Sequence, residues 1–144
     1  MVFDTGALVE LLEPTSKIGE ELKASMAEGS INAHVSEVSL AELYYVMCRR
    51  LRHERATSRY EDLRASNYLY VTETSSLTFL AGRYKCERSM SLADCFSLAL
   101  GKHLRLPVLF RSREQELELE LKKKPFDLQI LFLEDYGRTT ARHR

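Results

Sequence analysis

Three acidic residues occupy positions from which a carboxylate could take part in metal chemistry, and Asp4 is the first of them. It directly follows the apolar residues Val2 and Phe3 and precedes a stretch whose leucines have helical spacing. In open parallel sheets, functional groups collect beyond the carboxyl ends of the strands, and the N-terminus of the next helix stabilises a negative charge there. A residue that only caps this helix would occupy the same position, so Asp4 by itself leaves both interpretations open.

The tetrapeptide Ser-Leu-Ala-acid occurs twice, at residues 39–42 and 91–94, and ends in Glu42 and Asp94. Each copy opens a segment with helical spacing of apolar residues and matches the capping box, in which the acid only satisfies backbone donors of the first turn. Both acids also border the apolar stripe of their helix, where a side chain can point into a cleft. With Asp4 they would suit a hard divalent cation such as Mg²⁺, which prefers oxygen ligands and often takes one or two protein carboxylates.

The elements that must position these acids alternate between strand and helix along the chain. Apolar runs predict strands, and 3.6-residue spacing or helix-forming composition predicts helices. The predicted strands cover residues 2–4, 31–35, 69–72, 107–110 and 130–133. The predicted helices cover residues 7–13, 17–28, 39–51, 52–65, 76–87, 91–104 and 114–124. This order predicts a single α/β domain over residues 1–136, with a largely parallel central sheet flanked by helices on both faces, and a frayed polar C-terminal tail over 137–144.

The composition excludes several classes of protein. The chain has 144 residues, with 21 basic and 21 acidic side chains, and its apolar fraction of 44% is that of a globular domain. Its apolar runs are all shorter than the ~18–20 residues of a membrane span, and its acidic start is unlike a signal peptide. We therefore expect no membrane association.

Three cysteines, Cys48, Cys86 and Cys95, match no metal-binding spacing. An odd number of cysteines favours free thiols in a reducing cytoplasm, although pairing of Cys86 with Cys95 stays open if the source is a hyperthermophile.

The sequence resembles a known family. The hydrophobic-Asp-Thr start, the mid-chain Ser-Leu-Ala-Glu-Leu-Tyr-Tyr and the later Ser-Leu-Ala-Asp-Cys-Phe-Ser-Leu-Ala-Leu are similar, in order and spacing, to PIN domains and more narrowly to VapC toxins. The resemblance implies a metal-dependent ribonuclease in which Asp4, Glu42 and Asp94 bind Mg²⁺ or Mn²⁺ and the Thr5 hydroxyl supports the site. It also implies a homodimer and a cognate VapB-like antitoxin that occludes the site.

One departure from the family pattern concerns the fourth acid. The family usually has Thr-x-Asp directly after the strand that follows the third motif, and here Phe110 and Ser112 stand at those positions. Glu114 and Glu116 offer carboxylates in the next turn, although neither is at the matching position, so we include Ser112 and Glu116 among the candidate catalytic residues.

The charge is unevenly distributed, which bears on a nucleic-acid partner. Residues 1–42 carry eight acids and two lysines, whereas residues 43–113 carry thirteen basic and six acidic groups. A local positive field attracts a polyanion even when the net charge is zero. The candidate RNA contacts, which would bind phosphates without reading sequence, are Arg49, Arg50, Arg111 and Arg113. An ordinary solvated helix face explains the first two equally well.

The sequence therefore predicts an endoribonuclease, the toxin of a toxin–antitoxin pair, that hydrolyses RNA phosphodiester bonds with a carboxylate-bound metal ion. The serine at position 112 supports an alternative, a catalytically degenerate PIN-like module that binds RNA or a protein without cutting it. A third interpretation is an unrelated α/β domain in which the three acids are helix caps.

Overall fold

Five short strands form one parallel sheet in the computed structural model, which describes residues 1–140, with side chains described to residue 136. The strands are β1 (Val2–Phe3), β2 (Ala33–Ser36), β3 (Leu69–Thr72), β4 (Val108–Phe110) and β5 (Ile130–Phe132). They lie in the order β3-β2-β1-β4-β5, and each neighbouring pair is parallel. The predicted α/β class and parallel sheet are confirmed.

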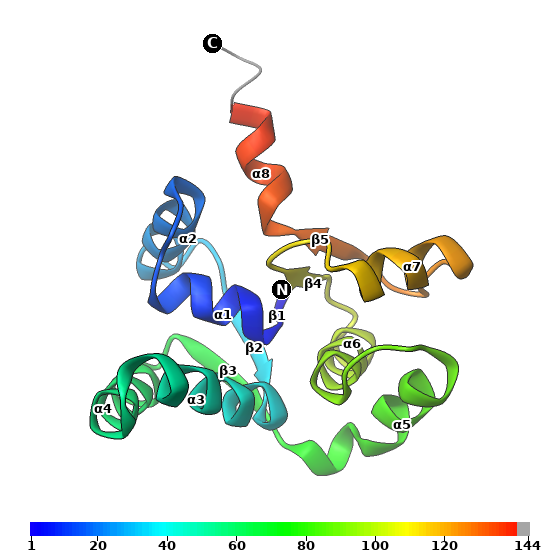
Figure 1. Cartoon of the computed structure of the whole chain (residues 1–144), viewed down its shortest axis with the longest axis horizontal. Helices are drawn as coiled ribbons and strands as arrows, with labels where there is room; N and C mark the ends of the chain where they lie inside the picture. Colours follow the sequence, from blue (N-terminus) through cyan, green and yellow to red (C-terminus); the bar gives the residue numbers. More distant parts are fainter. Residues whose placement is uncertain (141–144) are drawn as a thin grey trace.

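Helices cover both faces of this sheet (Figure 1). They are α1 (Thr5–Leu12), α2 (Lys17–Ala27), α3 (Glu37–Leu51), α4 (His53–Ala65), α5 (Thr78–Glu87), α6 (Leu92–Leu104), α7 (Gln115–Lys123) and α8 (Leu133–Thr140), with a 3₁₀ turn at Thr74–Ser76. In Figure 1, α1 to α4 lie to the left of the strands and α5 to α7 to the right. The core is divided in the same way, because consecutive strand residues face opposite sides: Phe3 packs with the first group of helices and Val2 with the second.

The structure differs from the sequence prediction at several element boundaries, of which the start of α3 and the C-terminus matter most here. Helix α3 begins at Glu37, not at Ser39, because the Ser36 side chain accepts a hydrogen bond from the Ser39 backbone and is the cap. Glu42 therefore lies beyond the first turn, and the prediction of a capping box at residues 39–42 is wrong. At the C-terminus, residues 137–140 belong to α8, where a frayed tail was expected, and residues 141–144 lie outside the described part.

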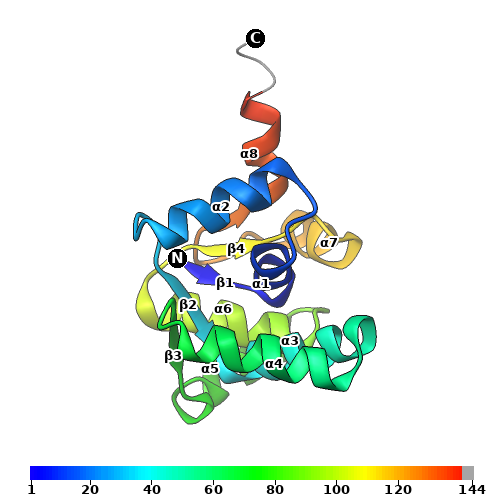
Figure 2. The ribbon, with the colours of Figure 1, turned by 90° about the vertical axis from the view of Figure 1, so that its left-hand side faces the viewer.

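Helix α8 extends away from the body and rests on α2 at its base, as Figure 2 shows from the side. No helix among the described residues is long and apolar enough to cross a membrane. Cys48, Cys86 and Cys95 are all free, so Cys86 and Cys95 are not paired.

A buried chain of three hydroxyl groups joins α3 to α6 and sets how these helices pack. The hydroxyls of Ser36 and Ser39 are 3.0 Å apart, and those of Ser39 and Ser97 are 3.2 Å apart. Ser36, Ser39 and Ser97 are all buried, so their polar groups depend on one another for hydrogen bonds. This link fixes the distance between the helices that carry Glu42 and Asp94.

We expect Ser36→Ala to lower the free energy of unfolding by about 1–2 kcal/mol, because it removes the cap of α3 and leaves Ser39 with one hydroxyl partner fewer. Urea denaturation measures this loss. The exposed Ser75→Ala is the control and is expected to change stability by less than about 0.5 kcal/mol. Equal stability of both variants would contradict a structural role for the hydroxyl chain.

Candidate functional site

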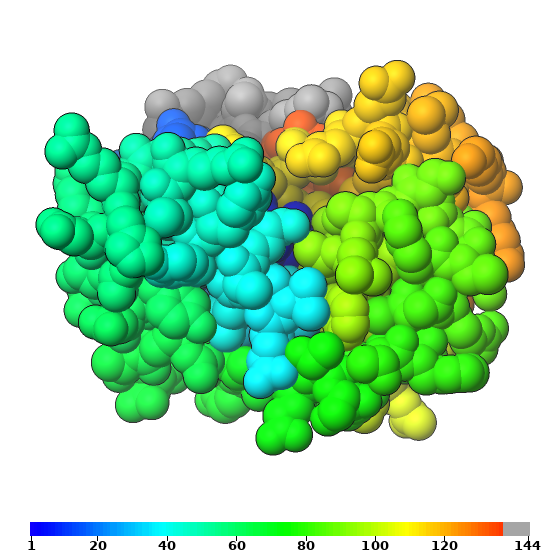
Figure 3. All heavy atoms as spheres, turned by 60° about the horizontal axis from the view of Figure 1, so that its bottom comes forward, coloured from blue at the N-terminus to red at the C-terminus, as the bar shows by residue number. Residues whose placement is uncertain are grey.

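The candidate site lies where the strand order of the sheet reverses. From β1 the chain continues to β2 and β3 on one side, whereas β4 and β5 lie on the other side. Ligand sites of open α/β sheets form at this point, beyond the carboxyl ends of the strands. Asp4 directly follows β1, and its backbone N–H donates to Leu109 of β4 at 3.1 Å. In the space-filling view of Figure 3, a hollow between α3 and α6 has N-terminal residues, coloured blue, at its floor.

Asp4 is the most buried acid of this region, with 9% of its surface exposed. Its carboxylate caps α1 by accepting a hydrogen bond from the Ala7 backbone at 2.8 Å. Burial raises its pKa from 3.8 to about 7, and the nearby charges of Asp94 and Glu114 add to this shift, while hydrogen bonds from Ala7 and Gly6 oppose it. A carboxylate in this position favours either a proton or a cation close to its oxygens.

Thr5 is buried beside Asp4, and its hydroxyl oxygen has no hydrogen-bond partner among the described residues. Unpaired buried hydroxyls are costly and uncommon. The position of this one, next to a buried carboxylate, is consistent with the supporting role that the sequence suggested for Thr5.

Asp94 is half-buried at the start of α6, where the expected capping box is present. Its backbone N–H donates to the Ser91 hydroxyl at 3.1 Å, and Ser91 donates hydrogen bonds back to the Asp94 carboxylate. Burial raises the pKa of Asp94, and the charges of Glu42 and Glu114 raise it further, whereas the bonds from Ser91 lower it. Asp4 and Asp94 thus both lie at helix caps, and the charge of Asp94 also acts on Asp4, so capping and participation in a shared site are compatible.

A small pocket, of about 30 Å³, brings these acids together with the segment after β4. This is room for one or two water molecules. Its lining residues are Asp4, Asp94, Phe110, Arg111, Ser112, Glu114, Glu116 and Leu117. Glu42 does not line it, although its charge acts on Asp94. The described residues contain no group of three or more His, Cys, Asp or Glu arranged to hold a metal ion, so the set of Asp4, Glu42 and Asp94 stays a prediction.

The donor atoms at this pocket suit a hard divalent cation. The two carboxylates with raised pKa values that line it are oxygen donors, the type that Mg²⁺ and Mn²⁺ take, and the unpaired Thr5 hydroxyl belongs to the residue next to one of them. Among the residues that line the pocket, no cysteine or histidine offers a softer alternative.

Comparison with known proteins identifies the family. A family model described as PIN domain matches residues 1–117. The chain belongs to the PIN-domain family. The interpretation as an unrelated α/β domain is therefore wrong. No curated protein matches the sequence.

Solved structures with the same fold include toxins of toxin–antitoxin systems. VapC20 of Mycobacterium tuberculosis, a Sarcin-Ricin loop cleaving toxin, is 19% identical, with a TM-score of 0.62, over 83% of this chain and 94% of that chain. DNA-bound VapBC from Salmonella typhimurium is 15% identical, with a TM-score of 0.66, and the match covers 92% of this chain and 96% of that chain. VapBC2 from Rickettsia felis, bound to promoter DNA, is 14% identical, with a TM-score of 0.66, and the match covers 92% of this chain and 98% of that chain. At identities this low, the similarity to these structures shows a shared fold, that of the PIN domain.

The four arginines predicted to bind RNA fall into two groups in this PIN domain. Arg111 lies 3.4 Å from Glu10 and Arg113 lies 2.6 Å from Asp135, so both have acidic partners within the chain. Arg49 stacks on the Tyr45 ring at 4.3 Å, and both it and Arg50 are exposed on α3. Arg49 and Arg50 have no acidic partner among the described residues, whereas Arg111 lines the acidic pocket.

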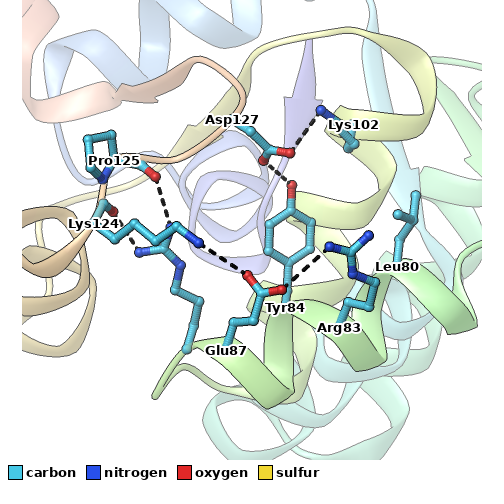
Figure 4. Close-up of a pocket in the computed structure, with 9 residues that line it drawn as sticks. Leu80, Arg83, Tyr84, Glu87, Lys102, Lys124, Pro125 and Asp127 are labelled. Atoms are coloured by element: carbon cyan, nitrogen blue, oxygen red, sulfur yellow. Dashed lines mark hydrogen bonds and ion pairs between the residues drawn. The ribbon is translucent and has the colours of Figure 1, made fainter.

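A larger pocket of the PIN domain, about 200 Å³ in volume, lies between α5, α6 and the segment after α7 (Figure 4). Its charged side chains pair with one another. The Tyr84 hydroxyl donates to Asp127 at 2.6 Å, and Lys102 lies 2.8 Å from the other oxygen of Asp127. Glu87 lies between Arg83 and Lys124. Because these charges are already compensated, we place the candidate catalytic site at the acidic pocket.

Proposed function

We propose that this PIN domain is a metal-dependent endoribonuclease of the VapC toxin type. The observation that carries the proposal is the pairing of Asp4 with Asp94, two carboxylates with raised pKa values, at one pocket beyond β1 and β4. Carboxylates whose pKa values are raised by burial and by neighbouring charges are typical of sites that bind a cation or transfer protons. The toxins among the structural neighbours support the same function.

In this proposal Asp4 and Asp94 hold Mg²⁺ or Mn²⁺, with Glu42 as the third acid and Thr5 as a supporting hydroxyl. When bound, the ion would acidify a water molecule and neutralise charge on the scissile phosphate. The chain contributes fixed ligands, because the caps of α1 and α6 hold both carboxylates in place. The exposed Arg49 and Arg50 would bind the phosphate backbone and orient the RNA.

The neighbours from Salmonella and Rickettsia are VapBC complexes, which supports a VapB-like antitoxin as the protein partner. We further propose a homodimer that works in the cytoplasm, which agrees with the three free thiols. The antitoxin partner is tested by co-purification with the product of a neighbouring small reading frame that has a DNA-binding N-terminus. The homodimer is tested by light scattering.

RNA cleavage by the purified chain, with Mn²⁺ and with EDTA, tests the nuclease. We expect cleavage products only with Mn²⁺, because the acidic pocket needs a cation to act on a phosphodiester. Equal cleavage in both samples would contradict metal dependence.

The second candidate function is a PIN module that binds RNA or a protein without cutting it. Ser112 favours it, because the pocket has a hydroxyl where the family usually has a carboxylate. RNA binding that is retained in Mn²⁺ without any cleavage would support this alternative.

A further inference from the structure

A cluster of three titratable side chains lies where α3 meets α4, and none of them lines the acidic pocket. The Cys48 sulfur and the Tyr44 hydroxyl, both on α3, contact Nδ1 of His53, the first residue of α4. The Sγ–Nδ1 distance is 3.6 Å, and the distance from the hydroxyl oxygen to Nδ1 is 2.8 Å. A thiol beside an imidazole that a third group orients is the arrangement of many nucleophilic cysteines, so this cluster is a candidate for chemistry of its own.

The hydrogen bonds around His53 indicate which atom carries the proton. The Thr57 hydroxyl donates its one proton to the His53 backbone carbonyl at 2.9 Å. In its contact with Tyr44, at 3.1 Å, the Thr57 oxygen therefore accepts, and the Tyr44 hydroxyl uses its own proton there. Tyr44 is then left with an acceptor oxygen toward His53, so Nδ1 carries a hydrogen and donates it to Tyr44 beside the Cys48 sulfur.

The surroundings of Cys48 favour a negatively charged sulfur. The Nδ1–H of His53 is within hydrogen-bonding distance of the sulfur, and a thiolate accepts such a bond better than a thiol does. Helix α4 begins at His53 without a side-chain cap, so the positive end of its dipole lies at the cluster. The carbonyl end of α3 opposes a negative charge, but Arg49 and Arg50 lie in the same last turn and offset it.

The chain has two other free thiols, which differ from Cys48 in their surroundings. Cys86 is exposed on α5, whereas Cys95 is buried in α6, where burial raises its pKa to about 11. Cys48 is partly exposed, and among the described residues it is the cysteine that hydrogen-bonds to a histidine. Cys86 therefore serves as a comparison for accessibility, and Cys95 for burial.

We propose that Cys48 is a site of covalent modification, which forms a mixed disulfide with low-molecular-weight disulfides. The Cys48 thiolate attacks one sulfur of the disulfide, and the S–S bond of that molecule breaks as the new S–S bond forms. The other sulfur leaves as a thiolate and takes up a proton from water, which balances the proton that Cys48 released. This inference is independent of the nuclease, because it uses no group of the acidic pocket.

Incubation of the reduced full chain with glutathione disulfide tests the inference, with mass spectrometry of the peptides to follow each cysteine over time. We expect Cys48 to be modified about 10-fold or more faster than Cys86, although Cys86 is the more exposed, because the thiolate is the attacking species. Cys95 should be the slowest. Modification of Cys86 at the same rate as Cys48, or faster, would overturn the inference, because accessibility alone would then set the order.

Two substitutions test the role of His53. His53→Phe keeps a ring against Tyr44 but removes the N–H, and we expect it to slow modification of Cys48 by about 10-fold. His53→Asn returns a side-chain N–H near the position of Nδ1 and should recover part of the rate. His103→Gln, at an exposed position of α6, is the matched control and should leave the rates of all three cysteines unchanged.

An unchanged rate at Cys48 in His53→Phe would contradict the inference, and so would an equal slowing at Cys86. Circular dichroism of each variant verifies that the fold is retained. If His53→Phe does not fold, the comparison of the three thiols in the wild type and the rate in His53→Asn still decide the question.

Discussion

Asp94→Asn is expected to reduce Mn²⁺-dependent RNA cleavage by at least about 100-fold, the size of effect seen when one electrostatic stabiliser of a transition state is removed. Asparagine has nearly the same shape and still accepts the hydrogen bonds that Ser91 donates to the side chain, so the start of α6 stays capped. What changes is the charge that faces Asp4 across the pocket. Loss of this charge weakens the hold on a divalent cation and leaves the scissile phosphate less stabilised.

The measurement is the initial rate of cleavage of a structured RNA at saturating Mn²⁺. Asp62→Asn is a suitable control, because Asp62 is an exposed acid on α4 that does not line the acidic pocket. Its rate should match that of the wild type. A similar small loss for both variants would show that Asp94 acts only as a helix cap.

Asp4→Asn is expected to stabilise the metal-free protein at pH 8 by up to about 4 kcal/mol. The pKa of Asp4 is about 7 in the folded chain and near its ordinary value of 3.8 in the unfolded chain. Between these values the unfolded state loses its proton first, so the folded state becomes less stable as the pH rises from about 4 to 7. A difference of about three pKa units corresponds to about 4 kcal/mol. Asparagine keeps the cap of α1 and does not titrate.

Thermal unfolding in EDTA at several pH values measures this effect. The melting temperature of Asp4→Asn should exceed that of the wild type at pH 8, and the difference should shrink as the pH falls toward 4. Addition of Mn²⁺ at pH 8 should stabilise the wild type more than the variant, because a ligand that binds only the folded state shifts the unfolding equilibrium. A variant that is less stable than the wild type at pH 8 would mean that the Asp4 charge is well accommodated without a cation.

Local sequence patterns predicted most of the fold. Residues 114–124 alternate Glu and Leu with the period of a strand, yet their helix-forming composition and i, i+4 pairs favoured a helix, and α7 confirms it. Two of the differences from the predicted boundaries have a visible cause. Helix α3 begins early because Ser36 serves as its cap, and the chain beyond Tyr136 is helical where a polar composition suggested fraying. The contacts of Arg113 with Glu134 and Asp135 hold the start of that helix.

The candidate site could be predicted only in part. Asp4 and Asp94 were identified from their positions after a strand and at a helix start, and the structure brings both to one pocket. The sequence repeat wrongly placed Glu42 in the cap of its helix, because the residue that caps this helix, Ser36, lies outside the repeated tetrapeptide. The grouping of Ser112, Glu114 and Glu116 at this pocket depends partly on a backbone hydrogen bond from Glu114 to Ser112 that no residue type specifies.

The proposed function depends on Asp4 and Asp94 holding a divalent cation beyond the carboxyl ends of β1 and β4. A crystal structure of the chain grown or soaked with Mn²⁺ tests it most directly, because anomalous scattering locates this ion independently of the protein model. We expect a Mn²⁺ peak between the carboxylates of Asp4 and Asp94. Absence of a peak there at saturating Mn²⁺ would contradict it.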